Sequence, residues 1–119
     1  MKYRTTKKHL EWFKEGCDHW LTQFGLTDWV CDFDIDKIEN EAQVLFFKKV
    51  SQAFFTLNKT MTVRPTRKRI KSVALHECLH LLVYTICGLT HKNFRFRSEP
   101  IVRILAKVIC ADKDIKLKV

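Results

Sequence analysis

The chain has 119 residues, of which 46% are apolar and 29% are charged, and its formal net charge at pH 7 is +9. This length and apolar content suit one hydrophobic core, so we expect a single domain over residues 1–119. No apolar run approaches the roughly 18 residues that span a bilayer, and the basic N-terminus lacks the apolar segment of a signal peptide, so we expect a cytoplasmic protein without a membrane partner.

The cysteine content argues against both a disulfide-stabilised protein and a zinc-ribbon protein. The five cysteines are an odd number and none forms a Cys-x-x-Cys pair, which argues against a disulfide framework and against a zinc ribbon. Each cysteine lies in or beside an apolar segment, so we expect buried free thiols.

The first half of the chain predicts one helix followed by three strands. From Thr6 to Phe24 apolar residues recur at steps of three and four, which is typical of a helix, and Gly25 supplies its stop. From Trp29 to Asp36 apolar and mainly acidic residues alternate, as in a strand with one buried and one acidic face. Residues 42–50 and 52–58 predict two more strands, and we expect a three-stranded antiparallel meander.

The second half predicts two helices, which makes the fold class α+β. One helix is expected from Thr66, just after Arg64-Pro65, to Gly88, and the other begins near Ser98. The apolar residues expected on the buried face of the first are Val73, Leu79, Leu82, Val83 and Ile86; those of the second are Ile101, Ile104, Leu105, Val108 and Ile109.

The sequence His76-Glu77-Cys78-Leu79-His80 is a His-Glu-x-x-His motif within the first of these helices. Four residues turn an α-helix through about 400°, so the two imidazoles lie nearly in line, one turn apart, and can share a metal ion. Glu77 lies about 100° round from His76, where it can act on a metal-bound water without being a ligand. The motif therefore predicts a zinc-hydrolase site.

The bare motif also arises by chance, so its surroundings matter. It is flanked by Val73, Ala74 and Leu75 and then by Leu81, Leu82 and Val83, which predicts a buried helix. Buried polar groups are costly unless they are paired, and coordination of a metal would pair these. The alternative is that both histidines bond to the backbone and that Glu77 pairs with a surface lysine.

A third ligand must come from further along the chain, because catalytic zinc commonly has three protein ligands and one open position. Glu99, in the first turn of the last helix, is one candidate, although an acidic residue there also favours the helix dipole. His91, in the preceding loop, is the other, although it also suits an exposed loop.

The order of elements and the motif resemble the minimal gluzincin-type metallopeptidases, in particular small phage metallopeptidases, and are also similar to SprT-like domains. The resemblance implies a zincin-like fold with His76, His80 and Glu99 as zinc ligands and Glu77 as general base. The SprT-like comparison would instead make His91 the ligand, but the glycine that follows that histidine in the family is missing here, so we favour Glu99. A phage origin would place the protein in the cytoplasm of a bacterial host.

The implied activity is hydrolysis of a peptide or protein substrate, which in such folds often adds as a strand to a sheet edge; we expect that edge within residues 42–58. The residue that stabilises the oxyanion stays open among Tyr84, His91, Arg95 and Arg97. The target is either general or one narrow protein substrate. Oligomeric state is not indicated.

Five cations gather where the motif helix begins: Arg64, Arg67, Lys68, Arg69 and Lys71. Positive charge opposes the dipole at a helix N-terminus, so helix stability does not account for them, whereas contact with nucleic acid would. The alternatives are a solvated surface or, as a separate functional hypothesis, a basic nucleic-acid-binding protein whose zinc site is structural or vestigial.

Overall fold

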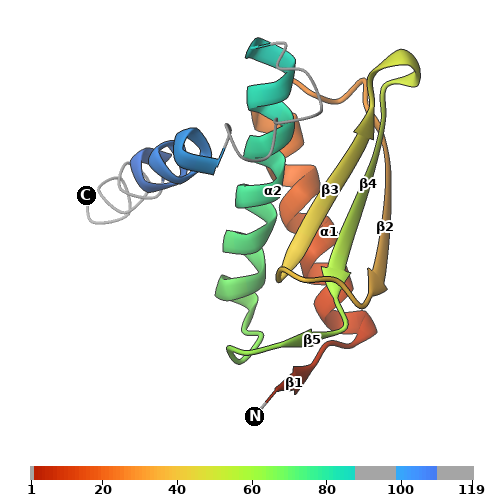
Figure 1. The fold of residues 1–119 in the computed structure, drawn as a ribbon, viewed down its shortest axis with the longest axis vertical. Helices are drawn as coiled ribbons and strands as arrows, with labels where there is room; N and C mark the ends of the chain where they lie inside the picture. Colours follow the sequence, from red (N-terminus) through yellow and green to blue (C-terminus); the bar gives the residue numbers. More distant parts are fainter. Residues whose placement is uncertain (1, 88–98, 110–119) are drawn as a thin grey trace. The chain divides into compact units, whose positions relative to one another are not determined.

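The computed structural model describes residues 2–87 and 99–109 (Figure 1). In chain order the elements are β1 (Tyr3–Arg4), α1 (Lys7–Gln23), β2 (Val30–Asp36), β3 (Ala42–Phe47), the 3-10 turn η1 (Lys48–Val50), β4 (Gln52–Asn58), β5 (Thr60–Met61) and α2 (Arg67–Cys87), and residues 99–109 form a further helix. The predicted α+β class is confirmed. Within the described residues, no helix has the length and apolar character needed to cross a membrane.

The chain divides into two compact units, Met1–Cys78 and Leu79–Val119, with the boundary inside α2. The first contains both small sheets, α1 and the first half of α2. The second contains the remainder of α2 and the helix at residues 99–109. A single domain over residues 1–119 stays a prediction.

The three-stranded sheet has the order β2-β4-β3, so the predicted antiparallel meander is wrong. β3 pairs antiparallel with β4, as predicted for neighbours in sequence, but β2 pairs parallel with the other side of β4. Consecutive strands usually pair, and that assumption failed here because β4, largely buried along its length, takes the central position. β2 shows the expected alternation, with its acidic residues exposed.

A second sheet was not predicted. β1 pairs antiparallel with β5 over only two residues each, too short for a periodic signal. The hydroxyl of Thr5, just after β1, donates to the backbone oxygens of Asn58 and Lys59 at 2.8 and 3.0 Å. These bonds fix the N-terminal segment beside the end of β4.

Helix α1 begins and ends where the sequence predicts. At its start His9 Nδ1 accepts the backbone N–H of Thr6 at 3.0 Å, in the place of the usual capping-box carboxylate. At its end Gly25 has φ 70°, and the N–H of Leu26 donates to the carbonyl of Leu21 at 2.8 Å. Since the N–H of Gly25 also donates to Thr22, this is a Schellman motif, closed by the buried pair Leu21 and Leu26.

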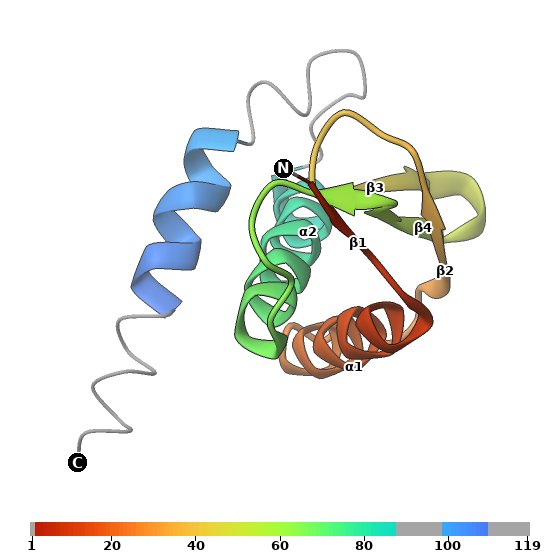
Figure 2. The same cartoon turned by 90° about the horizontal axis from the view of Figure 1, so that it is seen from below.

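The core of the first unit forms where α1 meets the sheet (Figure 2). Phe13 of α1 is fully buried and makes edge-on contacts with Phe33 of β2 and Phe55 of β4, at centroid distances of 6.2 and 6.3 Å. Phe33 and Phe55 are register partners and stack on each other at 5.2 Å. This aromatic cluster therefore joins the parallel strand pair to the helix.

Helices α1 and α2 approach closely at Gly16. A Cβ placed on Gly16 would lie 2.9 Å from the Cβ of Ala74, closer than carbon atoms normally pack. One turn further, the Cys78 thiol lies 3.7 Å from the backbone oxygen of Cys17. The small side chains at this crossing set the position of the first half of α2.

The predicted buried faces of α2 and of the last helix need correction. On α2, Val73, Leu79 and Val83 are buried as predicted, but Ile86 is 72% exposed. In the last helix Val102 is fully buried, whereas three predicted core residues are exposed: Ile101, Ile104 and Val108. The cause is the placement of Glu99, which contacts His80 and lies on the same helix face as Val102. Ser98, Gly88 and the tail from residue 110 lie outside the described residues.

The described cysteines whose side chains are placed are free thiols, as predicted: Cys17 and Cys78 are buried and Cys31 is half-buried. Burial, with smaller contributions from Cys78 and then other neighbours, raises the pKa of Cys17 well above its usual value. Burial likewise raises the pKa of Cys31 to about 11. The side chain of Cys87 and all of Cys110 lie outside the described part.

Replacing Gly16 by Val should lower the free energy of unfolding by about 1–3 kcal/mol, because the new methyl groups overlap α2 at Ala74. The measurement is urea denaturation. Glu11→Val, at an exposed position of the same helix, controls for the introduction of a β-branched side chain and should cost well under 1 kcal/mol. Equal losses in the two variants would contradict the close approach.

Alkylation of Cys31 by iodoacetamide at pH 8 should be about tenfold slower in the folded protein than in urea, because the greater nucleophilicity of a thiolate with a higher pKa offsets part of the loss of thiolate. The loss arises because a pKa of about 11 leaves far less reactive thiolate than the usual value of 9.0. Mass spectrometry of the peptide that contains Cys31 reports its rate separately from the other thiols. The protection should disappear as the pH rises through 11, and a native rate equal to the unfolded rate would refute it.

Candidate metal centre

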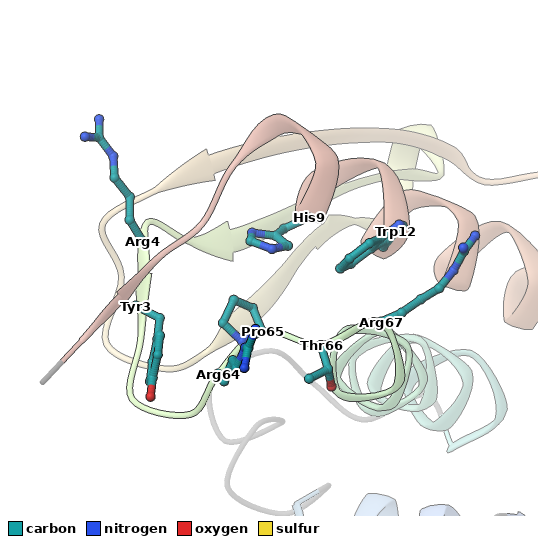
Figure 3. A pocket seen from close by; sticks show the side chains of 8 residues that line it. All are labelled: Tyr3, Arg4, His9, Trp12, Arg64, Pro65, Thr66 and Arg67. Atoms are coloured by element: carbon teal, nitrogen blue, oxygen red, sulfur yellow. The ribbon is translucent and has the colours of Figure 1, made fainter.

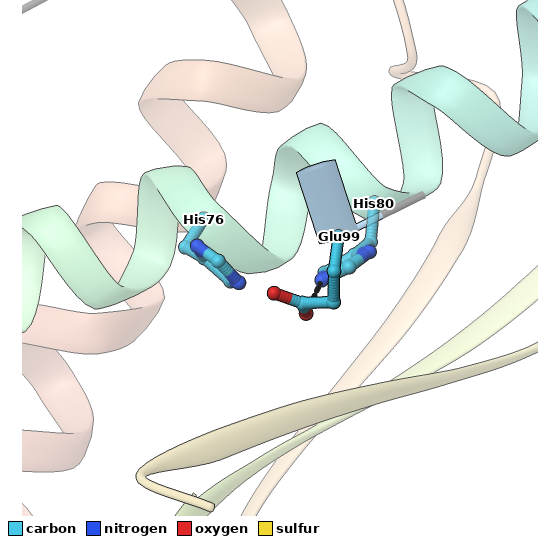
Figure 4. Close-up of side chains that lie close together, drawn as sticks. All are labelled: His76, His80 and Glu99. Atoms are coloured by element: carbon cyan, nitrogen blue, oxygen red, sulfur yellow. Dashed lines mark hydrogen bonds and ion pairs between the residues drawn. The ribbon is translucent and has the colours of Figure 1, made fainter. Parts of the chain in front are cut away.

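Helix α2 brings the two motif histidines to one side, as the sequence predicts. His76 and His80 project from successive turns in the same direction (Figure 4). His76 is half-buried and His80 is 1% exposed. A helix this apolar leaves a buried imidazole few partners other than a side chain brought to it.

Glu99 is that partner. Its Oε1 lies 2.7 Å from Nε2 of His80, within the second unit. Its other oxygen lies 3.4 Å from Nε of Arg103, one turn along the same helix. Both carboxylate oxygens are therefore held, one by a buried imidazole and one by an exposed guanidinium.

The ligand atoms of His76, His80 and Glu99 all lie within 4.8 Å of one another, and the three residues can hold a metal ion. Two imidazoles and one carboxylate are the donor set of one class of catalytic zinc site, and they also suit Fe(II). With zinc bonds of 2.0–2.2 Å, tetrahedral ligand atoms lie roughly 3.4 Å apart. The contact of 2.7 Å between His80 and Glu99 would thus open by about 0.7 Å, and any wider separation, up to 4.8 Å, would close, through side-chain rotation.

Glu77 follows His76 directly and is 4% exposed. Ionised side chains are rarely this buried, and in the structure Glu77 has a partner, as do both histidines. Its charge also reaches the thiol of Cys17, where it is a minor cause of the raised pKa after burial and Cys78. A carboxylate therefore occupies the buried position that the motif assigns to a general base.

The structure thus brings together His76, His80 and Glu99, the three ligands that the sequence favours. The competing ligand His91 and two candidate oxyanion donors, Arg95 and Arg97, lie outside the described residues. The remaining donor, Tyr84, is half-buried on α2. Sequence reasoning missed Arg103, although its spacing of four from Glu99 on a helix is a recognisable signal for a charge pair.

The basic run before α2 is partly engaged within the first unit. Arg67 pairs with Glu15 at 3.0 Å, and both side chains are more than half exposed. Arg69 binds Glu41 with two nitrogens, one at 3.1 Å. These pairs give two of the five cations a structural partner that the sequence did not suggest. Within the described residues, Arg64, Lys68 and Lys71 make no ion pair.

Comparison of the chain with protein-family models, curated proteins and solved structures gave no match. The resemblance stated from the motif therefore rests on this chain's own residues.

The chain purified without chelators should contain about one divalent ion, because His76, His80 and Glu99 together form a complete three-donor set. His80→Ala removes the buried donor and should abolish retention of the ion through dialysis. Elemental mass spectrometry measures the content and distinguishes zinc from iron.

His19→Ala, an exposed histidine of α1, is the matched control and should keep the ion. Added metal at a hundredfold excess over its Kd should stabilise the wild-type chain by about 2.7 kcal/mol and leave His80→Ala unchanged. A metal-free wild-type chain, or full retention by His80→Ala, would rule out the centre.

Proposed function

We propose that the protein is a zinc-dependent metallopeptidase that hydrolyses peptide bonds, with one narrow protein target. The observation that supports this most directly is the cluster of His76, His80 and Glu99 with the buried Glu77 next to the first ligand. A purely structural metal site would have no need of that carboxylate, which is costly to bury.

Zinc in this centre would polarise the peptide carbonyl and make a water molecule acidic at neutral pH. The carboxylate of Glu77 accepts one proton from that water while the water oxygen attacks the carbonyl carbon. Glu77 then delivers the proton to the amide nitrogen, the C–N bond breaks, and the products are a carboxylate and an amine. Hydrolysis is thereby balanced with one water consumed and Glu77 regenerated.

Glu99 serves as the third ligand in this proposal, and Arg103 orients it. Contacts at both oxygens restrict the rotation of the Glu99 carboxylate before metal arrives, which lowers the entropic cost of binding. Because Arg103 is largely exposed, its contribution is small and sensitive to salt.

The substrate strand is proposed to pair with β3. This strand is an edge of the sheet and exposes two large apolar side chains, Leu45 and Phe47. An extended peptide can bond to the free backbone groups of such an edge while its side chains contact those residues. β3 lies within residues 42–58, where the sequence analysis expects the substrate edge. We also propose a minimal zincin-like fold, with a mixed sheet in place of the predicted meander.

Glu77→Gln should lower the peptide-cleavage rate by about 10²–10⁴-fold while the metal content stays at its wild-type value, because glutamine cannot accept the proton. Cleavage is followed by mass spectrometry of a proteome-derived peptide mixture and of denatured proteins incubated with the chain. Glu11→Gln, an exposed carboxylate of α1, should cleave at the wild-type rate.

Equal cleavage by wild-type and Glu77→Gln chains would refute the assigned base. Metal retained without cleavage of any protein in a host lysate would favour the other function considered from the sequence, a basic nucleic-acid-binding protein with a structural metal.

A further inference from the structure

The first unit contains a pocket of about 520 Å³ formed by β1, the first turns of α1 and the segment that leads into α2 (Figure 3). Its lining combines cations with aromatic rings, and the residues used below are Tyr3, Arg4, His9, Trp12, Arg64 and Arg67. None of the described residues that line it carries a carboxylate. A volume of this size is typical of sites for one small molecule or one unit of a polymer.

Trp12 supplies the main aromatic surface. Its ring is half-buried, contacts the imidazole of His9 at 5.3 Å, and has Lys8 Nζ at 5.6 Å and Arg67 Cζ at 5.8 Å from its centroid. Two cations and an imidazole therefore lie against the ring, and a stacked base would displace one of these exposed cations. A half-buried indole in an open pocket is a surface on which a nucleobase can stack, worth about 1–3 kcal/mol.

The other walls are held by the fold. Tyr3, 38% exposed, lies in β1, which pairs with β5 and is followed by the bonds of Thr5 to the end of β4. Pro65 is buried and fixes the chain just before α2. The pocket therefore does not have to fold around its ligand.

Three guanidinium groups line the pocket: Arg4, Arg64 and Arg67, of which Arg4 extends outward (Figure 3). Arg67 pairs with Glu15, but that pair is more than half exposed and so weak that a phosphate can displace it. Burial and the neighbouring Lys8 lower the pKa of His9, and its Nδ1 accepts the N–H of Thr6. Because Nδ1 accepts this backbone N–H, Nε2 is the ring nitrogen that can donate to a ligand.

We propose that this pocket binds one nucleotide of a single-stranded nucleic acid, with the base stacked on Trp12 and the phosphate bound by Arg64 and Arg67. An acidic peptide would use the cations but not the aromatic rings, and an apolar ligand would not use three arginines. Exposed lysines close in sequence to the lining residues add positive charge along which a strand can continue: Lys7, Lys8, Lys68 and Lys71. A strand is thereby favoured over a free nucleotide.

The test is fluorescence anisotropy of the full chain with a labelled single-stranded oligothymidine about twelve nucleotides long. Trp12→Leu, which keeps apolar volume but loses the stacking surface, should weaken binding by about 5- to 150-fold. Arg64→Gln, at an exposed position, should weaken it and lower the slope of log K against log salt by about 0.7. Circular dichroism confirms that each variant is folded.

Two controls match these variants. Trp20→Leu removes a half-buried tryptophan near the other end of α1, and Lys49→Gln removes an exposed cation in η1. Both should bind like the wild-type chain, or nearly so. Glu77→Gln should also bind normally, which separates this proposal from the proposed peptidase function.

Further arms identify the ligand. Duplex DNA of the same length should bind more weakly, because its bases are already stacked. If thymidine monophosphate alone binds as tightly as the oligomer and its binding depends on Trp12, the pocket is still a nucleotide site, but its ligand is a free nucleotide and not a strand. No binding, binding unaffected by Trp12→Leu, equal affinity for duplex, or equal displacement by polyglutamate would overturn the proposal.

Discussion

The burial of His80 is the constraint on which the candidate site depends. An imidazole that is 1% exposed needs a partner inside the protein, and in the structure that partner is Glu99, from a separate helix. The contact turns Glu99 and Val102 inward and leaves an apolar stripe of the last helix exposed. One buried polar group thus accounts both for the residue that joins the candidate ligand cluster and for the helix face that is covered.

The first unit is organised by a different requirement, the close approach of α1 and α2. Gly16 and Ala74 leave space for it, and the fully buried Phe13 fills the angle between α1 and the sheet. Because His76 follows Ala74 by two residues on α2, the packing that fixes the helix also fixes the position of the first candidate ligand. The site therefore depends on small side chains that have no chemistry of their own.

Most of the candidate site was predictable from the sequence because it depends on local periodicity. A step of four on one helix places His76 and His80 in line, and Schellman geometry at Gly25 follows from the residue itself. Pairings over long distances were not predictable: the parallel alignment of β2 with β4 and the two-residue pairing of β1 with β5 have no periodic signal. The prediction of the buried face of the last helix was also wrong, because the contact of Glu99 with His80 overrode the hydrophobic pattern.

The order β2-β4-β3 leaves the sheet with two unlike edges. Along β2, Asp32, Asp34 and Asp36 are exposed at alternate positions, and Thr56 of β4 donates to Asp34 at 2.8 Å. β3 has no such row and exposes Leu45 and Phe47 instead. Charge along an edge strand discourages pairing with another chain. The acidic residues of β2 therefore disfavour edge-to-edge aggregation there, whereas β3 has no such charge. The two edges therefore differ in charge, and this difference would direct the strand pairing proposed above to β3.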